Sequence, residues 1–119
     1  MKTKLVGLML ILVAGGSVAA GTDDLANILD AAAKQRHDGN LRVAIELLET
    51  ARAAAGPACP PRLTGELGAT YFQAHRLQEA EALLIEAHTR AADPAERALF
   101  ANDLGNLSAS RGRAEEAVR

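Results

Sequence analysis

Apolar residues in this sequence recur at helical spacing, and no segment alternates between apolar and polar residues with period two. β-branched residues are sparse, so the pattern predicts an all-α protein without strands. Helix-breaking residues divide the chain into five helical stretches and the start of a sixth. The expected helices cover about 23–38, 40–56, 61–75, 77–92, 94–110 and 113–119.

The expected helix ends carry recognisable signals. Gly39 and Gly112 each stop a helix, and Asn40 is a good N-cap for the helix that follows. Residues 93–96, Asp-Pro-Ala-Glu, combine a capping aspartate, a first-turn proline and a glutamate that reaches back as in a capping box. His75 occupies the place of the two glycines in the other segments, so we expect a left-handed backbone there.

Aligning the helices reveals an internal repeat. The pattern Leu-x2-Ala-x3-Leu-x2-Ala begins at Leu41 and again at Leu77, 36 residues later, and a partial copy begins at Ala114. Leu67-Gly68 likewise recurs as Leu104-Gly105, 37 residues later. A fixed period of this length with two helices per unit is typical of a helical solenoid.

The middle unit resembles the tetratricopeptide repeat family. Leu67-Gly68-x2-Tyr71, Ala80-x3-Leu84, Ala87 and Pro94 follow the pattern of that family in order. The last unit repeats part of the pattern, and the first unit matches only in its second helix. The resemblance implies an all-α, right-handed α-solenoid of antiparallel helix hairpins, about two and a half repeats long. The repeat domain would span 21–119, with units at about 23–57, 60–92 and 94–119, the last one incomplete.

Gly68 is unfavourable within the predicted helix, because glycine there costs about 1 kcal/mol relative to alanine. Paired helices that cross closely require small residues where their backbones approach. We expect Gly68, Ala80 and Ala87 to supply this close contact, while Tyr71 and Leu84 fill the space beside it.

The first twenty residues have the order of a secretory signal peptide. Lys2 and Lys4 precede an apolar run over 5–14, and small residues over 15–20 permit cleavage after Ala19 or Ala20. The alternative is an uncleaved anchor, although the run is short of the roughly 20 residues that span a bilayer. No cysteine near the cleavage site is available for lipid attachment, so the prediction is a periplasmic or secreted protein with no membrane span after cleavage.

Charge and cysteine content limit the kinds of partner and of cysteine chemistry that the sequence allows. Without Lys2 and Lys4, 11 basic residues face 15 acidic ones, a balance of −4, and the arginines are dispersed. This predicts no nucleic-acid or anionic-membrane partner. Cys59 is the only cysteine, so it is either a lone loop thiol or a group for an intermolecular disulfide or redox role.

The sequence offers no chemistry typical of an enzyme. It contains no phosphate-binding loop, nucleophile elbow or zinc motif, so we expect no catalytic residue, no cofactor and no metal. The acidic pairs near 79–81 and 115–116 lie at helix starts, where acids favour the helix dipole.

The resemblance instead implies a concave groove, lined by the first helix of each hairpin, that binds a protein or peptide. Asn102 and Asn106 lie one turn apart, and two carboxamides so spaced can hold the N–H and C=O groups of an extended peptide. A polar solvent-facing surface is equally compatible with this spacing. The same register directs further residues into the groove, namely Arg62, Ala69, Gln73 and Arg36.

The sequence is compatible with two functions. The first is a non-catalytic scaffold that binds a protein or peptide outside the cytoplasm. The second is an N-terminal docking module of a larger exported protein, in which a segment after Arg119 carries further repeats or an enzyme domain. Ala117 and Val118 belong to an incomplete repeat, so self-association through the open C-terminal edge is also expected.

Overall fold

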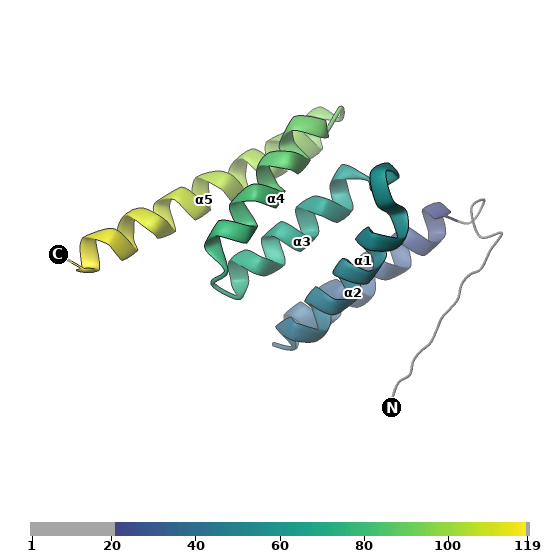
Figure 1. The fold of residues 1–119 in the computed structure, drawn as a ribbon, viewed down its shortest axis with the longest axis horizontal. Coiled ribbons are helices and arrows are strands. Elements are labelled where there is room, and N and C mark those ends of the chain that lie inside the picture. Colours follow the sequence, from purple (N-terminus) through teal and green to yellow (C-terminus); the bar gives the residue numbers. More distant parts are fainter. Residues whose placement is uncertain (1–20, 119) are drawn as a thin grey trace.

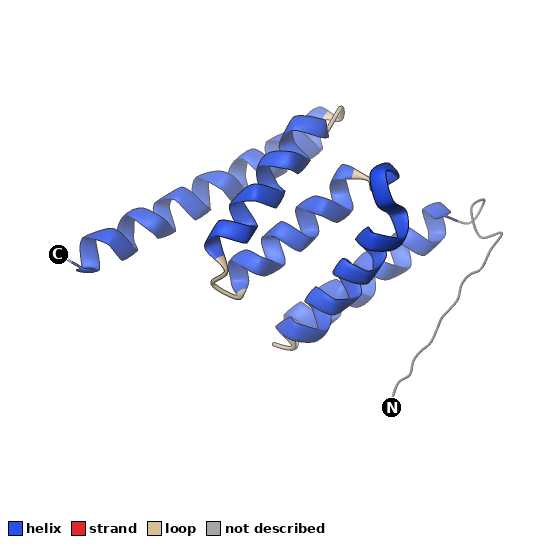
Figure 2. Ribbon diagram, viewed as in Figure 1, coloured by secondary structure: helices blue, strands red, loops and turns tan. Residues whose placement is uncertain are grey.

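The computed structural model describes residues 21–118, and the side chains of residues 24–113. This part of the chain is helical, with no strand (Figures 1 and 2). The predicted signal peptide over 1–20 lies outside the described residues. Within them, no helix is both long and apolar enough to cross a bilayer. The elements are α1 (Gly21–His37), α2 (Leu41–Ala55), a 3₁₀ turn η2 (Gly56–Ala58), α3 (Pro61–Gln73), α4 (Leu77–Arg90) and α5 (Pro94–Val118).

The turns between helices follow most of the expected signals. Gly39 has φ 86° and His75 has φ 65°, so both positions are left-handed, as predicted. Asp93 accepts a hydrogen bond from a backbone N–H in the first turn of α5 at 3.2 Å. Asn40 is at the N-cap of α2, but its amide donates to the Gln35 side chain at 3.0 Å instead of capping the helix.

The predicted helix end at Gly112 is wrong, because α5 continues through it to Val118. A turn there would leave the last carbonyls of α5 without partners, and a following helix would have to compensate by burying apolar surface. The apolar residues over 113–118 are small, namely Ala114, Ala117 and Val118. Arg111 instead donates to Glu81 of α4 at 2.9 Å, which ties the continuing helix to its neighbour.

Each helix packs against the next one in the chain, and α3 also contacts α1 and α5. Helix α3 therefore touches all four other helices, and its contact with α4 is the most extensive. In Figure 1, α3 lies between the α1–α2 pair and the α4–α5 pair. The largest fully buried apolar side chains come from all helices except α1: Leu48, Leu63, Leu67, Leu84, Phe100 and Leu107.

Two glycines allow the neighbours of α3 to approach it closely. A Cβ on Gly68 would lie 2.9 Å from Leu84 Cγ and 3.3 Å from the carbonyl oxygen of Ala80, which confirms the predicted close contact with α4. A Cβ on Gly65 would lie 2.1 Å from a ring carbon of Phe100, a contact with α5 that the repeat pattern does not reveal. Both helices are thus held against the bare backbone of α3.

Cys59 lies in the loop after η2, as predicted, and its side chain is buried. Its Sγ lies 3.4 Å from Thr64 Oγ1 in the first turn of α3. In this structure Cys59 therefore acts as part of the core.

We predict opposite effects for alanine at two helical glycines. Gly65→Ala forces the Phe100 ring to move and should destabilise the protein by about 1–3 kcal/mol. Gly105→Ala meets no atom within 4 Å and should stabilise α5 by about 0.5–1 kcal/mol. Urea unfolding followed by circular dichroism measures both, and equal effects would contradict the close contact at Gly65.

A second pair of glycines tests the continuity of α5. Gly112 and Gly39 both have open space around a hypothetical Cβ, but only Gly39 has a positive φ. Gly112→Ala should therefore raise the free energy of unfolding by about 0.5–1 kcal/mol, whereas Gly39→Ala should lower it by about 1 kcal/mol. A loss of stability in Gly112→Ala would indicate a left-handed turn at that position.

Candidate functional site

One face of α3 is directed away from the core. Arg62, Glu66, Ala69 and Gln73 recur at helical spacing on this face, because the remaining sides of α3 are occupied by its buried residues. Arg62 and Gln73 are exposed, and Glu66 and Ala69 are half-buried. Three of the four are predicted groove residues. The structure thus brings Arg62, Ala69 and Gln73 onto a common surface.

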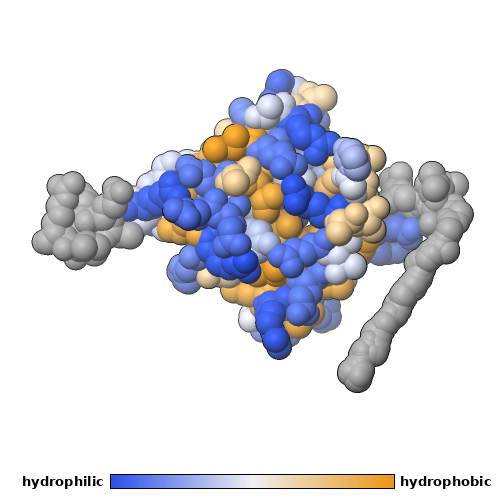
Figure 3. Space-filling model, in the orientation of Figure 1, coloured by the Kyte–Doolittle hydropathy of each residue, from blue (hydrophilic) through white to orange (hydrophobic). Residues whose placement is uncertain are grey.

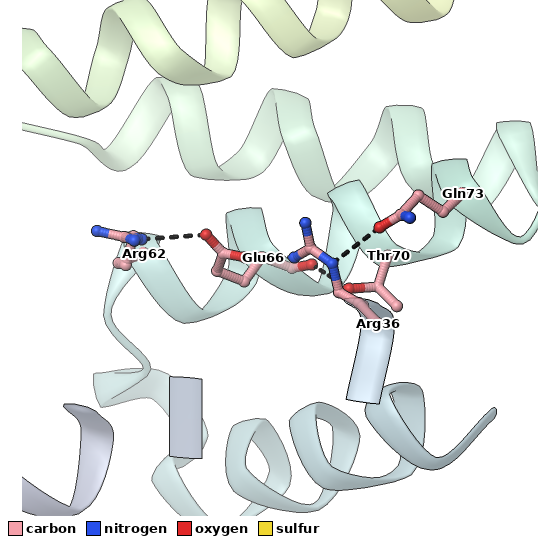
Figure 4. Close-up of polar contacts among 5 residues, drawn as sticks. All are labelled: Arg36, Arg62, Glu66, Thr70 and Gln73. Carbon is pink, nitrogen blue, oxygen red and sulfur yellow. Dashed lines mark hydrogen bonds and ion pairs between the residues drawn. The ribbon is translucent and has the colours of Figure 1, made fainter. Parts of the chain in front are cut away.

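Arg36 reaches this surface from the last turn of α1 (Figure 4). Its Nε donates to Gln73 Oε1 at 2.8 Å, and its Nη1 donates to Glu66 Oε1 at 2.5 Å. Arg62 Nε donates to the other oxygen of Glu66 at 3.2 Å. The Glu66 carboxylate therefore holds two arginines, one from each of two helices.

This network holds its side chains in fixed orientations and is partly shielded from water. The Arg36 and Glu66 side chains are 25% and 21% exposed, so their ion pair is partly shielded from water and stronger than a fully exposed pair of about 0.2–1 kcal/mol. The Thr70 hydroxyl donates to the backbone carbonyl of Glu66 at 2.7 Å, one turn earlier in α3. The result is a fixed array of guanidinium and amide donors.

Helix α5 adds Asp103 to the same side of the molecule. Asp103 is half-buried, and burial, followed by the nearby Glu66 carboxylate, raises the pKa of Asp103, while Arg36 opposes the increase. These effects indicate that Asp103 lies within electrostatic range of the α1–α3 network. Asn102 and Asn106 are exposed, and neither forms a hydrogen bond with another of the side chains described here.

The sequence alone did not identify Glu66 or Asp103 as candidates. The signal was present, since each acid directly precedes one copy of the repeated Leu-Gly pair, at Leu67 and Leu104. The two carboxylates are 37 residues apart and occupy equivalent places in their repeats.

Together these residues form a surface that crosses α1, α3 and α5, which we call the odd-helix face. Its members are Arg36, Arg62, Glu66, Ala69, Gln73 and Asp103, and the exposed Asn102 and Asn106 flank Asp103 in the sequence of α5. It has hydrogen-bond donors and acceptors and balanced charge, with two arginines and two acids. Among the side chains of residues 24–113, no group of histidine, cysteine and acidic residues is arranged to hold a metal ion.

Comparison of this sequence with protein-family models finds no match, and neither do searches of curated proteins and of solved structures. The resemblance to the tetratricopeptide repeat family therefore rests on the residues of this chain.

The raised pKa of Asp103 predicts a pH-dependent stability difference. Because the folded pKa lies above the unfolded one, near 3.9, the ionised carboxylate lowers stability at neutral pH, and this penalty disappears as the pH falls below the unfolded pKa. Asp103→Asn should therefore raise the melting temperature at pH 7 and change it little at pH 3.

Asp30→Asn is the matched control, because Asp30 is an exposed aspartate on α1. We expect this substitution to shift the melting temperature little at either pH. A lower melting temperature of Asp103→Asn at pH 7 would contradict the placement of Asp103 beside Glu66.

Proposed function

We propose that this protein is a non-catalytic scaffold that binds an extended peptide or protein segment on its odd-helix face. The observation that carries the proposal is the Arg36–Glu66–Gln73 network, which joins α1 to α3 on one accessible side of the molecule. A peptide needs regularly spaced donors and acceptors for its backbone, and pre-oriented side chains provide them with less loss of entropy.

The packing order supports a solenoid of helix hairpins. Helices α1, α3 and α5 would be the first helices of successive units, and α3 contacts both of the others in addition to its neighbours in the chain. In such a solenoid the first helices share one side and form a continuous binding surface. We infer two and a half units of this kind, in which the odd-helix face is the concave groove.

The two asparagines of α5 have the freedom to bind a peptide backbone. Both carboxamides are exposed and lie one turn apart, so one can accept a backbone N–H while the other donates to a carbonyl. We also propose that the segment over 1–20 directs export, which places this binding activity in the periplasm or outside the cell.

A peptide-display selection tests the function with an unbiased set of ligands. The protein, immobilised through its C-terminus, is exposed to a library of random linear peptides, and the enriched peptides are resynthesised and their dissociation constants measured. For these peptides, the double variant Asn102→Ala/Asn106→Ala should bind about tenfold more weakly than wild type.

The control is Arg42→Ala/Glu46→Ala, which removes two exposed side chains one turn apart on α2. This variant should bind the peptides as wild type does. If no peptide is enriched, or if the α2 variant weakens binding as much as the α5 variant, the odd-helix face is not the binding surface.

A further inference from the structure

A hollow of about 740 Å³ lies between α2 and α4, with α3 as its floor. Its volume is within the range of about 300–1,000 Å³ that small-molecule sites occupy. Figure 3 shows apolar surface at the centre of this face, bordered by polar surface. It is separate from the odd-helix face, and the function proposed above does not use it.

The floor of the hollow is apolar. Leu67 and Tyr71 of α3 and Cys59 after η2 line it with buried side chains, and Leu83 of α4 contributes a half-buried one. These groups offer van der Waals contact but few hydrogen bonds. The body of a ligand held here must therefore be largely apolar.

One end of the hollow has an excess of positive charge. The Glu86 carboxylate accepts hydrogen bonds from Arg52 Nη2 at 3.1 and 3.3 Å, and Arg90 Nη1 lies 3.6 Å from it. Two guanidinium groups thus share one carboxylate. Arg52 Nε is buried and has no hydrogen-bond partner among the described residues.

Both arginines also lie in the last turns of their helices, where the partial negative charge of the free carbonyls favours a cation. This explains why cations are placed here, but Glu86 remains their one side-chain carboxylate partner. The guanidinium donors at this end exceed the acceptors. A carboxylate from a ligand would supply the missing acceptor.

The opposite end is negative. Glu49 accepts a hydrogen bond from the Tyr71 hydroxyl, and Glu79 pairs with Arg76 at 2.5 Å. Burial, followed by the bond to Glu49, raises the pKa of Tyr71 to about 12, so its hydroxyl stays protonated and keeps donating to that carboxylate. With two acids and one arginine, this end repels a second anion.

The charge separation follows α4, where Glu79 and Arg90 are eleven residues apart, or roughly 16 Å along the helix, whereas Glu49 and Arg52 are one turn apart on α2. From this polarity we infer that the hollow binds a small amphipathic organic carboxylate, of the class of medium-chain fatty acids. The carboxylate lies between Arg52 and Arg90, and the apolar chain covers Leu67, Leu83 and the Tyr71 ring.

Intrinsic tyrosine fluorescence can report ligand binding at this site. Tyr71 is the only tyrosine and the chain has no tryptophan, so intrinsic fluorescence comes from the floor of the hollow. Decanoate, decanol and decylammonium, which share a chain length and differ in charge, are titrated at pH 7 below the micelle concentrations of the two ions and below the solubility limit of decanol. Decanoate should change the tyrosine emission saturably and bind about tenfold more tightly than decanol, with decylammonium weakest.

A variant locates the charge contact. Arg52→Gln/Arg90→Gln should weaken decanoate binding about tenfold and leave decanol binding unchanged, whereas Arg62→Gln on the odd-helix face should alter neither. No saturable response to decanoate, or equal or tighter binding of decanol or decylammonium to the wild type, overturns the proposal. This comparison of ligands needs no variant, so it decides even if the double variant is unstable.

Discussion

The missing side chains at Gly65 and Gly68 determine how the other helices meet α3. Phe100 of α5 occupies the space beside Gly65, and Leu84 of α4 occupies the space beside Gly68. Each of these bulky residues is fully buried, and together they bring two helices to the same short segment of backbone. Close packing of this kind tolerates little change in volume, so it fixes the position of both neighbours.

The two surfaces with recognisable chemistry both depend on that central helix. The approach of α5 places Asp103 near Glu66, and the approach of α4 places Arg76 over the Tyr71 ring, 4.4 Å from its centroid. One side of α3 thus carries the charged network of the odd-helix face. Another side forms the apolar floor of the hollow between α2 and α4. A single rigid helix in this way supports an extended surface and a compact cavity.

Much of the helical framework was predictable from local sequence signals. Glycine, proline and capping residues act within a few residues of their own position, so the boundaries of α2, α3 and α4 fall within two or three residues of those expected. The predicted helix end at Gly112 was wrong because a glycine permits a turn without requiring one. Whether the helix ends there depends on what the following residues can bury.

Contacts between distant residues were harder to predict. The repeat placed Arg36, Arg62 and Gln73 on one side of the molecule, but a register cannot state which carboxylate joins them. Glu66 emerges as that partner only when α1 and α3 are packed. The hollow could not be predicted from the sequence either. Its lining comes from three helices, and each contributes only a few residues.

Helix α3 is the central support of both surfaces, and native-state hydrogen exchange tests this directly. The buried amides of α3, from Leu63 to Tyr71, should exchange only through global unfolding, with a free energy equal to that from urea denaturation. Amides of α1 and of the end of α5 should exchange through smaller, local openings. If the α3 amides exchange as fast as those of α1, the helix is not the support on which the two surfaces depend.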